Sequence, residues 1–244
     1  MTPQAIEQVP LSFQVVNPMN YGWFMSRLPQ QHIDYLWRII NKKKGESHKE
    51  HLIGNISSSY VLEDENDYFF LNVLDPLARQ YHDKAGNQHP MRQYQRELTN
   101  YRLGLDSFWV NFQKKHEFNP PHDHDGVYSF VIWMQIPTSY EEQKKLSICA
   151  ESNAHGSISN FGFHYTNSLG NVSQFFYNME KEAEGYMVMF PSEMKHEVFP
   201  FYENDGERIS ISGNIGLTGR TKNQKDIMIG YYGNLERRKK WRNN

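Results

Sequence analysis

Residues 119–126, with the sequence Asn-Pro-Pro-His-Asp-His-Asp-Gly, place two imidazoles and two carboxylates in four consecutive positions. One residue separates His122 from His124, so in a β-strand both side chains would point to the same face. Two imidazoles that lie about 7 Å apart along a strand can converge on one cation. The segment therefore predicts part of a metal site.

A second cluster lies in residues 190–198, where His196 follows an apolar run and a Pro-Ser turn. Further along, Arg208 and Ser210 alternate with isoleucines, which predicts a strand with both polar side chains on one face. The guanidinium is planar and can donate two parallel hydrogen bonds to a carboxylate. In the sequence, the His122–His124 pair is followed by the distant His196 and then by the Arg208-x-Ser210 strand. This order predicts that His196 is a third metal ligand and that Arg208 and Ser210 bind an anion.

The other histidines are expected to be surface residues or satisfied core residues, because a single histidine is seldom a ligand. They are His32, His48, His51, His82, His89, His116, His155 and His164. Cys149 is the only cysteine, which excludes a disulfide framework and a cysteine-based zinc site.

The length, net charge and hydrophobic pattern of the chain limit the classes of protein to which it can belong. A chain of 244 residues can bury one sizeable core. A formal net charge of −2 gives no electrostatic argument for binding nucleic acid. The sequence shows neither a secretory signal pattern nor an apolar run of about 18 residues, so we expect a cytoplasmic protein without membrane contact. The basic run at 237–242 is expected to be a solvated end of the chain.

Residues 1–100 are predicted to form an extended and helical region before the β-rich part of the chain, and this region is called the preface. Residues 30–43 and 66–83 carry apolar side chains at steps of three and four, which is the period of an amphipathic helix. Residues 1–20 are expected to be extended, and residues 44–65 to be loop with a short strand around 60–62.

After residue 100, strand patterns and turn residues follow each other at short intervals, which is typical of an all-β sandwich or barrel. The expected strands are 107–112, 127–136, 146–150, 162–165, 173–177, 185–190 and 208–215. We predict a mainly β protein, a double-sheet jelly roll with the N-terminal helices packed outside it. The chain would form one domain over residues 1–244, with a preface (1–100), a jelly-roll core (101–217) and a C-terminal tail or helix (218–244).

Residues 105–217 resemble the Fe(II)- and 2-oxoglutarate-dependent oxygenases, in particular prolyl-hydroxylase-like members, whose fold is a cupin-like double-stranded β-helix. The usual ligands there are a His-x-Asp/Glu pair and a distal His, and an Arg-x-Ser holds the far carboxylate of 2-oxoglutarate. His122 matches the first ligand, His196 the distal ligand, and Arg208 with Ser210 the clamp. The amino-acid sequences of residues 119–124 and 190–198 are similar to those of small 2-oxoglutarate oxygenases of bacteria and phages.

Position 124 departs from that pattern, since His124 stands where the superfamily has Asp or Glu. His124 is a ligand in one interpretation, which gives a three-histidine site. In a second, Asp125 or Asp123 supplies the carboxylate through a bulge. In a third, water or an anion fills the position. A neutral ligand leaves one more positive charge at the metal site, which favours anion binding.

The resemblance implies an enzyme that uses Fe(II), 2-oxoglutarate and O2. It would hydroxylate a C–H bond of a protein or peptide residue, or of a small molecule, and release succinate and CO2. No side-chain acid or base is required, so none is named. The alternatives are a three-histidine cupin-type dioxygenase that does not use 2-oxoglutarate, and a non-catalytic ligand-binding jelly roll.

Three further expectations concern the surroundings of the site. Strand residues Asn111, Tyr128 and Trp133 are candidates for the pocket lining. The polar loop from 151 to 175 is a candidate lid over the substrate. The turn at 204–206 predicts a hairpin that returns Arg208 to the side of His196.

Overall fold

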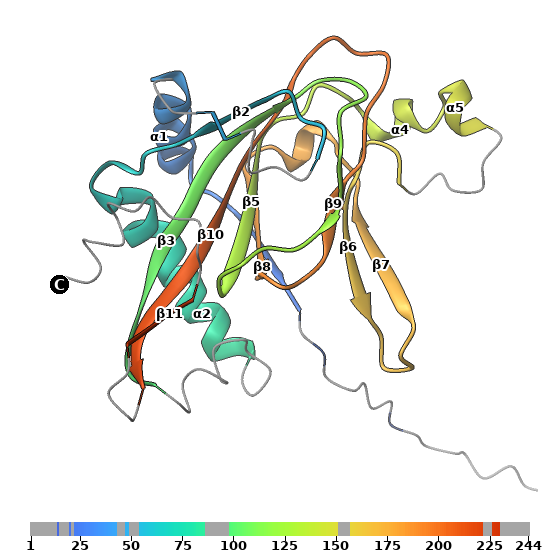
Figure 1. Cartoon of the computed structure of the whole chain (residues 1–244). Helices are drawn as coiled ribbons and strands as arrows, with labels where there is room; N and C mark the ends of the chain where they lie inside the picture. Colours follow the sequence, from blue (N-terminus) through green and yellow to red (C-terminus); the bar gives the residue numbers. More distant parts are fainter. Residues whose placement is uncertain are drawn as a thin grey trace, which may run out of the picture.

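Two antiparallel β-sheets form the centre of the computed structural model (Figure 1), which describes residues 14, 20, 22–42, 47–48, 54–85, 98–150, 157–221 and 226–229. The seven-stranded sheet has the order β1-β8-β5-β10-β3-β2, and β11 also pairs with β10. Its strands are β1 (Phe24–Arg27), β2 (Ser58–Val61), β3 (Leu98–Gln113), β5 (Tyr128–Gln135), β8 (Tyr186–Pro191), β10 (Arg208–Thr221) and β11 (Asp226–Ile229). The four-stranded sheet, in the order β4-β9-β6-β7, contains β4 (Asn119–His122), β9 (His196–Val198), β6 (Phe161–Thr166) and β7 (Val172–Tyr177).

From β3 onward the chain passes repeatedly between the two sheets. β3, β5, β8 and β10 belong to the large sheet, and β4, β6, β7 and β9 belong to the small one. This winding is the double-stranded β-helix, a jelly roll of two sheets. The predicted fold class is confirmed, and it brings short strands of the small sheet opposite long strands of the large one.

The two faces of β10 differ in polarity, as its alternating sequence predicts. Ile209, Ile211 and Ile215 are buried in the core on the helix side of the sheet. Gly213 faces the same side of the sheet as these isoleucines. A Cβ atom at this position would lie 2.5 Å from the Phe130 ring and 2.6 Å from the backbone oxygen of Ser107. Only glycine therefore permits this close approach. The polar residues of β10 face the space between the sheets.

The N-terminal helices cover the outer face of the large sheet (Figure 1). Helix α1 (Gln30–Asn41) buries one stripe of side chains, including Leu36 and Ile40, in the same core as β3, β5 and β10. Helix α2 (Asp75–Ala85) follows the π-helical segment η3 (Phe70–Leu74) and packs on that core as well. The prediction of helices outside the jelly roll is confirmed. No helix in the described part of the chain is long and apolar enough to cross a membrane.

The second helix begins later than the sequence predicts. Asn66 and Asp67, within the 3-10 turn η2 (Glu65–Asp67), both have a φ of 55°, which is the left-handed region and interrupts a helix. Asp64 instead accepts hydrogen bonds from the backbone N–H groups of Phe69 and Phe70, both at 2.8 Å. These bonds satisfy donors at the start of the helical run.

Residues 146–150 do not form the predicted strand. Short helices occupy this region, α4 (Tyr140–Gln143) and α5 (Ser147–Ala150), and Cys149 donates its backbone N–H to Leu146 O at 2.8 Å. A short apolar run has no period that separates a strand from a helical turn, so this prediction rested on composition alone.

The ends of the core also differ from the expectation. β10 continues to Thr221 and β11 follows it, so part of the expected tail or helix belongs to the large sheet. A further 3-10 turn, η5 (Lys181–Ala183), precedes β8. The expectations for 1–20, apart from positions 14 and 20, and for the basic run at 237–242 fall outside the described residues.

Candidate metal and co-substrate site

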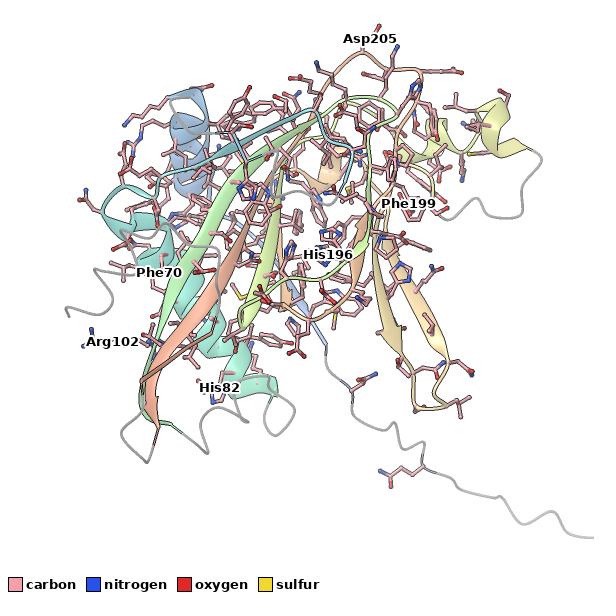
Figure 2. All side chains as sticks on the ribbon, in the orientation of Figure 1. Phe70, His82, Arg102, His196, Phe199 and Asp205 are labelled. Carbon is pink, nitrogen blue, oxygen red and sulfur yellow. The ribbon has the colours of Figure 1, made fainter. Side chains whose placement is uncertain are left out.

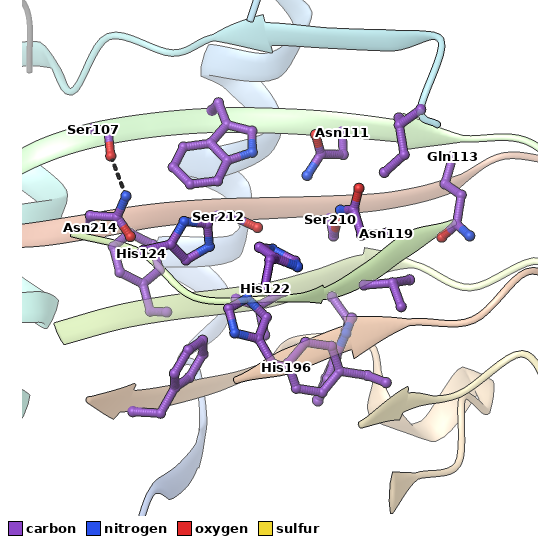
Figure 3. A pocket seen from close by; sticks show the side chains of 18 of the residues that line it. Ser107, Asn111, Gln113, Asn119, His122, His124, His196, Ser210, Ser212 and Asn214 are labelled. Atoms are coloured by element: carbon purple, nitrogen blue, oxygen red, sulfur yellow. Dashed lines mark hydrogen bonds between the residues drawn. The ribbon is translucent and has the colours of Figure 1, made fainter. Parts of the chain in front are cut away.

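Three histidines meet between the sheets, His122, His124 and His196. One ring nitrogen from each lies within 4.8 Å of the others. The centroids of the His122 and His196 rings are 4.3 Å apart, and the His124 ring lies 5.0 Å from each of them. Figure 2 shows His196 in the middle of the molecule, and Figure 3 shows the three rings turned toward one another. This is a group of neutral nitrogen donors able to hold one metal ion.

The backbone brings these side chains together in two ways. His122 is the last residue of β4 and lies opposite His196 in the β4–β9 pair. His124 is not on a strand, because β4 ends two residues earlier, so the alternation argument for the pair was wrong in this respect. Its backbone N–H instead donates to Ser192 O at 2.9 Å, in the turn that leads to His196.

Two of the rings have a defined tautomer. The Nδ1–H of His122 donates to Pro120 O at 2.7 Å, and the Nδ1–H of His196 donates to Met194 O at 3.0 Å. In a neutral ring, a proton on Nδ1 leaves the lone pair on Nε2. Both Nε2 atoms are thus available to a metal, in the arrangement that is common behind metal-bound histidines.

Burial keeps the three rings neutral. It lowers the pKa of His122, and it lowers the pKa of His196 well below the ordinary value of 6.5, with the neighbouring histidines adding to the effect. Burial, followed by the charge of His122, lowers the pKa of His124 to about 3. Desolvation disfavours the charged ring, and metal binding requires the neutral one.

The neighbouring carboxylates lie outside this group. Asp123 Oδ2 accepts a hydrogen bond from Lys195 Nζ at 2.7 Å, in a half-exposed ion pair. Asp125 is exposed. The described cluster therefore contains imidazoles and no carboxylate, as the first of the three interpretations of position 124 requires.

One wall of the site is a ladder of polar residues from β3 and β10. The register pairs Gln113 with Arg208, Asn111 with Ser210, Trp109 with Ser212, and Ser107 with Asn214. All eight residues line a cavity of about 450 Å³, together with the three histidines. Figure 3 labels six of these side chains along the two strands, on the side of the histidines: Ser107, Asn111, Gln113, Ser210, Ser212 and Asn214. The cavity size suits a small-molecule site.

Arg208 is completely buried at one end of this ladder. Its Nη2 donates to the backbone oxygen and the hydroxyl of Ser159, at 2.7 and 2.6 Å, and its Nη1 donates to Gln113 Oε1 at 3.3 Å. Burial lowers the pKa of Arg208 to about 9, so the guanidinium is still charged at neutral pH. Its Nε has no hydrogen-bond partner, and Arg208 forms no ion pair with any described residue. A buried cation without a carboxylate partner is costly, which makes Arg208 a candidate for binding an anion.

Several expectations about the surroundings need correction. Asn111 and Trp133 line the cavity, but Tyr128 is buried in the core on the helix side. Arg208 does not return on a hairpin, because β9 and β10 belong to different sheets and the chain crosses between them. Part of the candidate lid is the β6–β7 hairpin, and residues 151–156 are outside the described chain.

His48 was expected to be unrelated to the site, yet it is buried and lines the cavity. Its ring stacks on Trp109, with centroids 4.6 Å apart and planes 21° apart. Ser159 and Gln113, which hold Arg208, were also missed. No local pattern marks these residues, because their proximity depends on how the sheets and the preface pack.

One family of known proteins matches the part of the chain that carries this site. Residues 107–214 match the family model 2OG-FeII_Oxy_5, described as "Putative 2OG-Fe(II) oxygenase". The match begins and ends on the polar ladder and includes all three histidines and Arg208. The matched segment, residues 107–214, is thus similar to the core of an Fe(II)/2-oxoglutarate-dependent oxygenase, an oxidoreductase with Fe(II) as its metal and 2-oxoglutarate as its co-substrate. The suspected resemblance is thereby confirmed.

Solved structures with a similar chain path include a prolyl-4-hydroxylase of Pseudomonas putida, 15% identical, covering 79% of this chain and 91% of that chain, with a TM-score of 0.44. An oxidoreductase of the 2OG-Fe(II) oxygenase family from Burkholderia pseudomallei is 14% identical, covering 78% and 84%, with a TM-score of 0.47. A prolyl hydroxylase from Trichoplax adhaerens, in complex with a hypoxia inducible factor peptide fragment, is 12% identical, covering 80% and 82%, with a TM-score of 0.45. Among curated proteins, none matches this sequence.

Proposed function

We propose that His122, His124 and His196 hold the Fe(II) ion of this oxygenase. The observation that carries the proposal is the convergence of three neutral ring nitrogens within 4.8 Å in the cavity that also contains Arg208. Imidazole is a suitable ligand for iron, and three protein ligands leave positions for a co-substrate and O2. This ligand set has no negative charge, so the dianion of 2-oxoglutarate would be attracted to it strongly.

Arg208 and Ser210 would hold the carboxylate of 2-oxoglutarate that is remote from the metal. Arg208 Nε is a buried donor without a partner, and Ser210 lies on the same face of β10, one ladder step closer to the histidines. Ser159 and Gln113 would fix the orientation of the guanidinium. A charge-assisted hydrogen bond from a fixed guanidinium distinguishes a carboxylate from neutral ligands.

The reaction would be hydroxylation of a C–H bond. When bound, Fe(II) and 2-oxoglutarate supply the oxidation: 2-oxoglutarate is converted to succinate and CO2, and one oxygen atom of O2 becomes the hydroxyl of the product. The side chains of this protein bind and orient the reactants and enclose them, and none is needed as an acid or a base. From the prolyl-hydroxylase-like resemblance of the motifs, we infer a protein or peptide residue, or else a small molecule, as the primary substrate.

Anaerobic titration tests the proposal. Fe(II) should bind stoichiometrically, and 2-oxoglutarate should then produce a visible charge-transfer band. Arg208→Met should weaken 2-oxoglutarate binding by on the order of a hundredfold, because a buried charge pair loses one partner, while Fe(II) uptake persists. Arg79→Met, which removes an exposed arginine, is the control.

Each part of the proposal has its own contradicting result. Unchanged 2-oxoglutarate affinity in Arg208→Met would show that the clamp lies elsewhere, and Ser210→Ala should weaken binding to a smaller degree. Absence of stoichiometric Fe(II) uptake by the parent protein would contradict the ligand assignment.

A further inference from the structure

The indole N–H of Trp109 is a hydrogen-bond donor that takes no part in the proposed binding of the metal or of 2-oxoglutarate. The residue is 4% exposed, lines the cavity, and its Nε1–H has no partner among the described residues. A buried N–H without a partner is costly, so such groups generally serve a bound molecule or water. The indole N–H therefore identifies a position where a ligand of this cavity would present an acceptor.

The orientation of the indole is restrained by two other rings. His48 stacks on it at 4.6 Å, and His124 approaches at 5.8 Å with an interplanar angle of 67°. Trp109 thus lies directly beside the three-histidine cluster. His48 comes from the segment before residues 107–214, so this wall of the cavity is added to the matched core by the preface.

The position of Trp109 separates it from the proposed carboxylate clamp. Trp109 pairs with Ser212, two ladder steps from the Gln113–Arg208 pair. Each step is two residues, or about 6.6–6.8 Å of strand, so the backbone of Trp109 lies about 13 Å along β3 from that of Gln113. A five-carbon dicarboxylate that contacts Arg208 would reach the histidines at its other end and leave the Trp109 side open.

The next polar groups along the two strands, those of Ser107 and Asn214, are paired with each other. Asn214 Nδ2 donates to Ser107 Oγ at 2.9 Å, which Figure 3 marks with a dashed line, and Ser129 Oγ donates to Asn214 Oδ1 at 2.7 Å. Arg208 is the only arginine or lysine that lines the cavity among the described residues. Of the two carboxylates that line it, Asp123 is paired with Lys195 and Asp125 is exposed to solvent. A cation would be repelled by the metal and by Arg208, and an anion would lack a second positive partner.

We propose that Trp109 and His48 form the subsite for the primary substrate and that Trp109 Nε1–H donates to a neutral carbonyl oxygen of it, such as that of a peptide or other amide. The inference rests on the proposed function, because it places this carbonyl next to the metal and outside the co-substrate position. The substrate class is accordingly a neutral amide, and free carboxylates and amines are excluded as the recognised group.

Nitrogen-15 labelling of tryptophan tests the subsite directly. The indole N–H resonance of Trp109 is identified by its loss in Trp109→Phe, and the other tryptophans are internal controls, including Trp23, whose N–H donates to Tyr177. The protein is loaded with Zn²⁺ as a redox-inert ion and with 2-oxoglutarate. N-acetylglycinamide, N-acetylglycine and alanine N-methylamide are then added as neutral, anionic and cationic probes of similar size.

The neutral probe should shift the Trp109 resonance saturably, with a Kd on the order of millimolar for a ligand of this size. The two charged probes should bind at least about tenfold more weakly, and His48→Ala should weaken the neutral one. Equal affinity for a charged probe, or no shift with the neutral probe, overturns the proposal. So does a Trp109 shift on adding 2-oxoglutarate alone, with no further change on adding the amide. Calorimetry of Zn²⁺ and 2-oxoglutarate binding separates such a result from failure of the proposed function.

Discussion

His122 and His196 lie directly opposite each other in the β4–β9 pair, with their ring centroids 4.3 Å apart. Strand pairing thus fixes two of the proposed ligands. His124 has no such support from a strand, and it is held through the hydrogen bond from its backbone N–H to Ser192. Position 124 is accordingly the place where the ligand set can be changed with little effect on the sheet.

Replacing His124 by Asp should preserve Fe(II) binding and weaken 2-oxoglutarate binding. The substitution restores the carboxylate common in the superfamily, and it adds a negative charge next to a dianion. We expect a loss of about tenfold in 2-oxoglutarate affinity, or about 1.4 kcal/mol, measured by anaerobic titration. His116→Asp adds the same charge at an exposed position and should have no effect. Unchanged affinity in the His124 variant would refute the electrostatic argument.

Replacing Ser159 by Ala should weaken the co-substrate clamp indirectly. Ser159 Oγ accepts a hydrogen bond of 2.6 Å from Arg208 Nη2, and its loss leaves the guanidinium less firmly oriented. Hydrogen bonds to charged groups contribute about 1.5–3 kcal/mol, so a weakening of about tenfold or more in 2-oxoglutarate binding is expected. The comparison is with Ser147→Ala at an exposed site. If both variants bind 2-oxoglutarate like the parent, Ser159 has no positioning role.

Replacing Gly213 by Ala should destabilise the fold. The added methyl would lie 2.5 Å from the Phe130 ring and 2.6 Å from Ser107 O, and neither the buried ring nor the backbone can move freely. Such overpacking costs about 1–3 kcal/mol in the free energy of unfolding. Thermal and urea unfolding would measure the loss. Gly22→Ala, with no atom within 4 Å of the added carbon, should be close to neutral. Equal stability of the two variants would mean that β3 and β10 are farther apart.

The metal-free protein should lose stability as the pH falls below about 6.5. Burial lowers the pKa of His122 and His196, and it lowers that of His124 to about 3, whereas an unfolded chain has the ordinary value near 6.5. In this window the unfolded chain binds more protons, so the free energy of unfolding decreases with decreasing pH. Each histidine contributes a slope of up to about 1.4 kcal/mol per pH unit.

Urea unfolding of chelator-treated protein at about pH 7.5 and about pH 5.5 measures this slope. His124→Asn removes one of the groups and should make the dependence shallower, which separates the cluster from the carboxylates that titrate nearby. An unfolding free energy that rises on acidification, or a slope that is the same in the variant, contradicts the prediction.

The sequence by itself determined the parts of this protein that depend on local patterns. Alternation along β10 placed Arg208 and Ser210 on one face, and the three-to-four-residue period identified α1. The ligand candidates His122, His124 and His196 were visible because their residue types and flanking turns are distinctive. The structure places all five of these site residues around one cavity. Residues 146–150 were mispredicted because a short apolar run lacks a decisive period.

Tertiary structure decided which distant side chains surround those residues. Ser159 reaches Arg208, and His48 covers Trp109, only because the two sheets and the preface close around the same space. Likewise, β4 and β9 are short strands whose pairing depends on the winding of the jelly roll rather than on their own sequences. The alternation of residue types along a strand predicts which face of the sheet a side chain occupies. The packing of the sheets against each other determines which residues that side chain contacts.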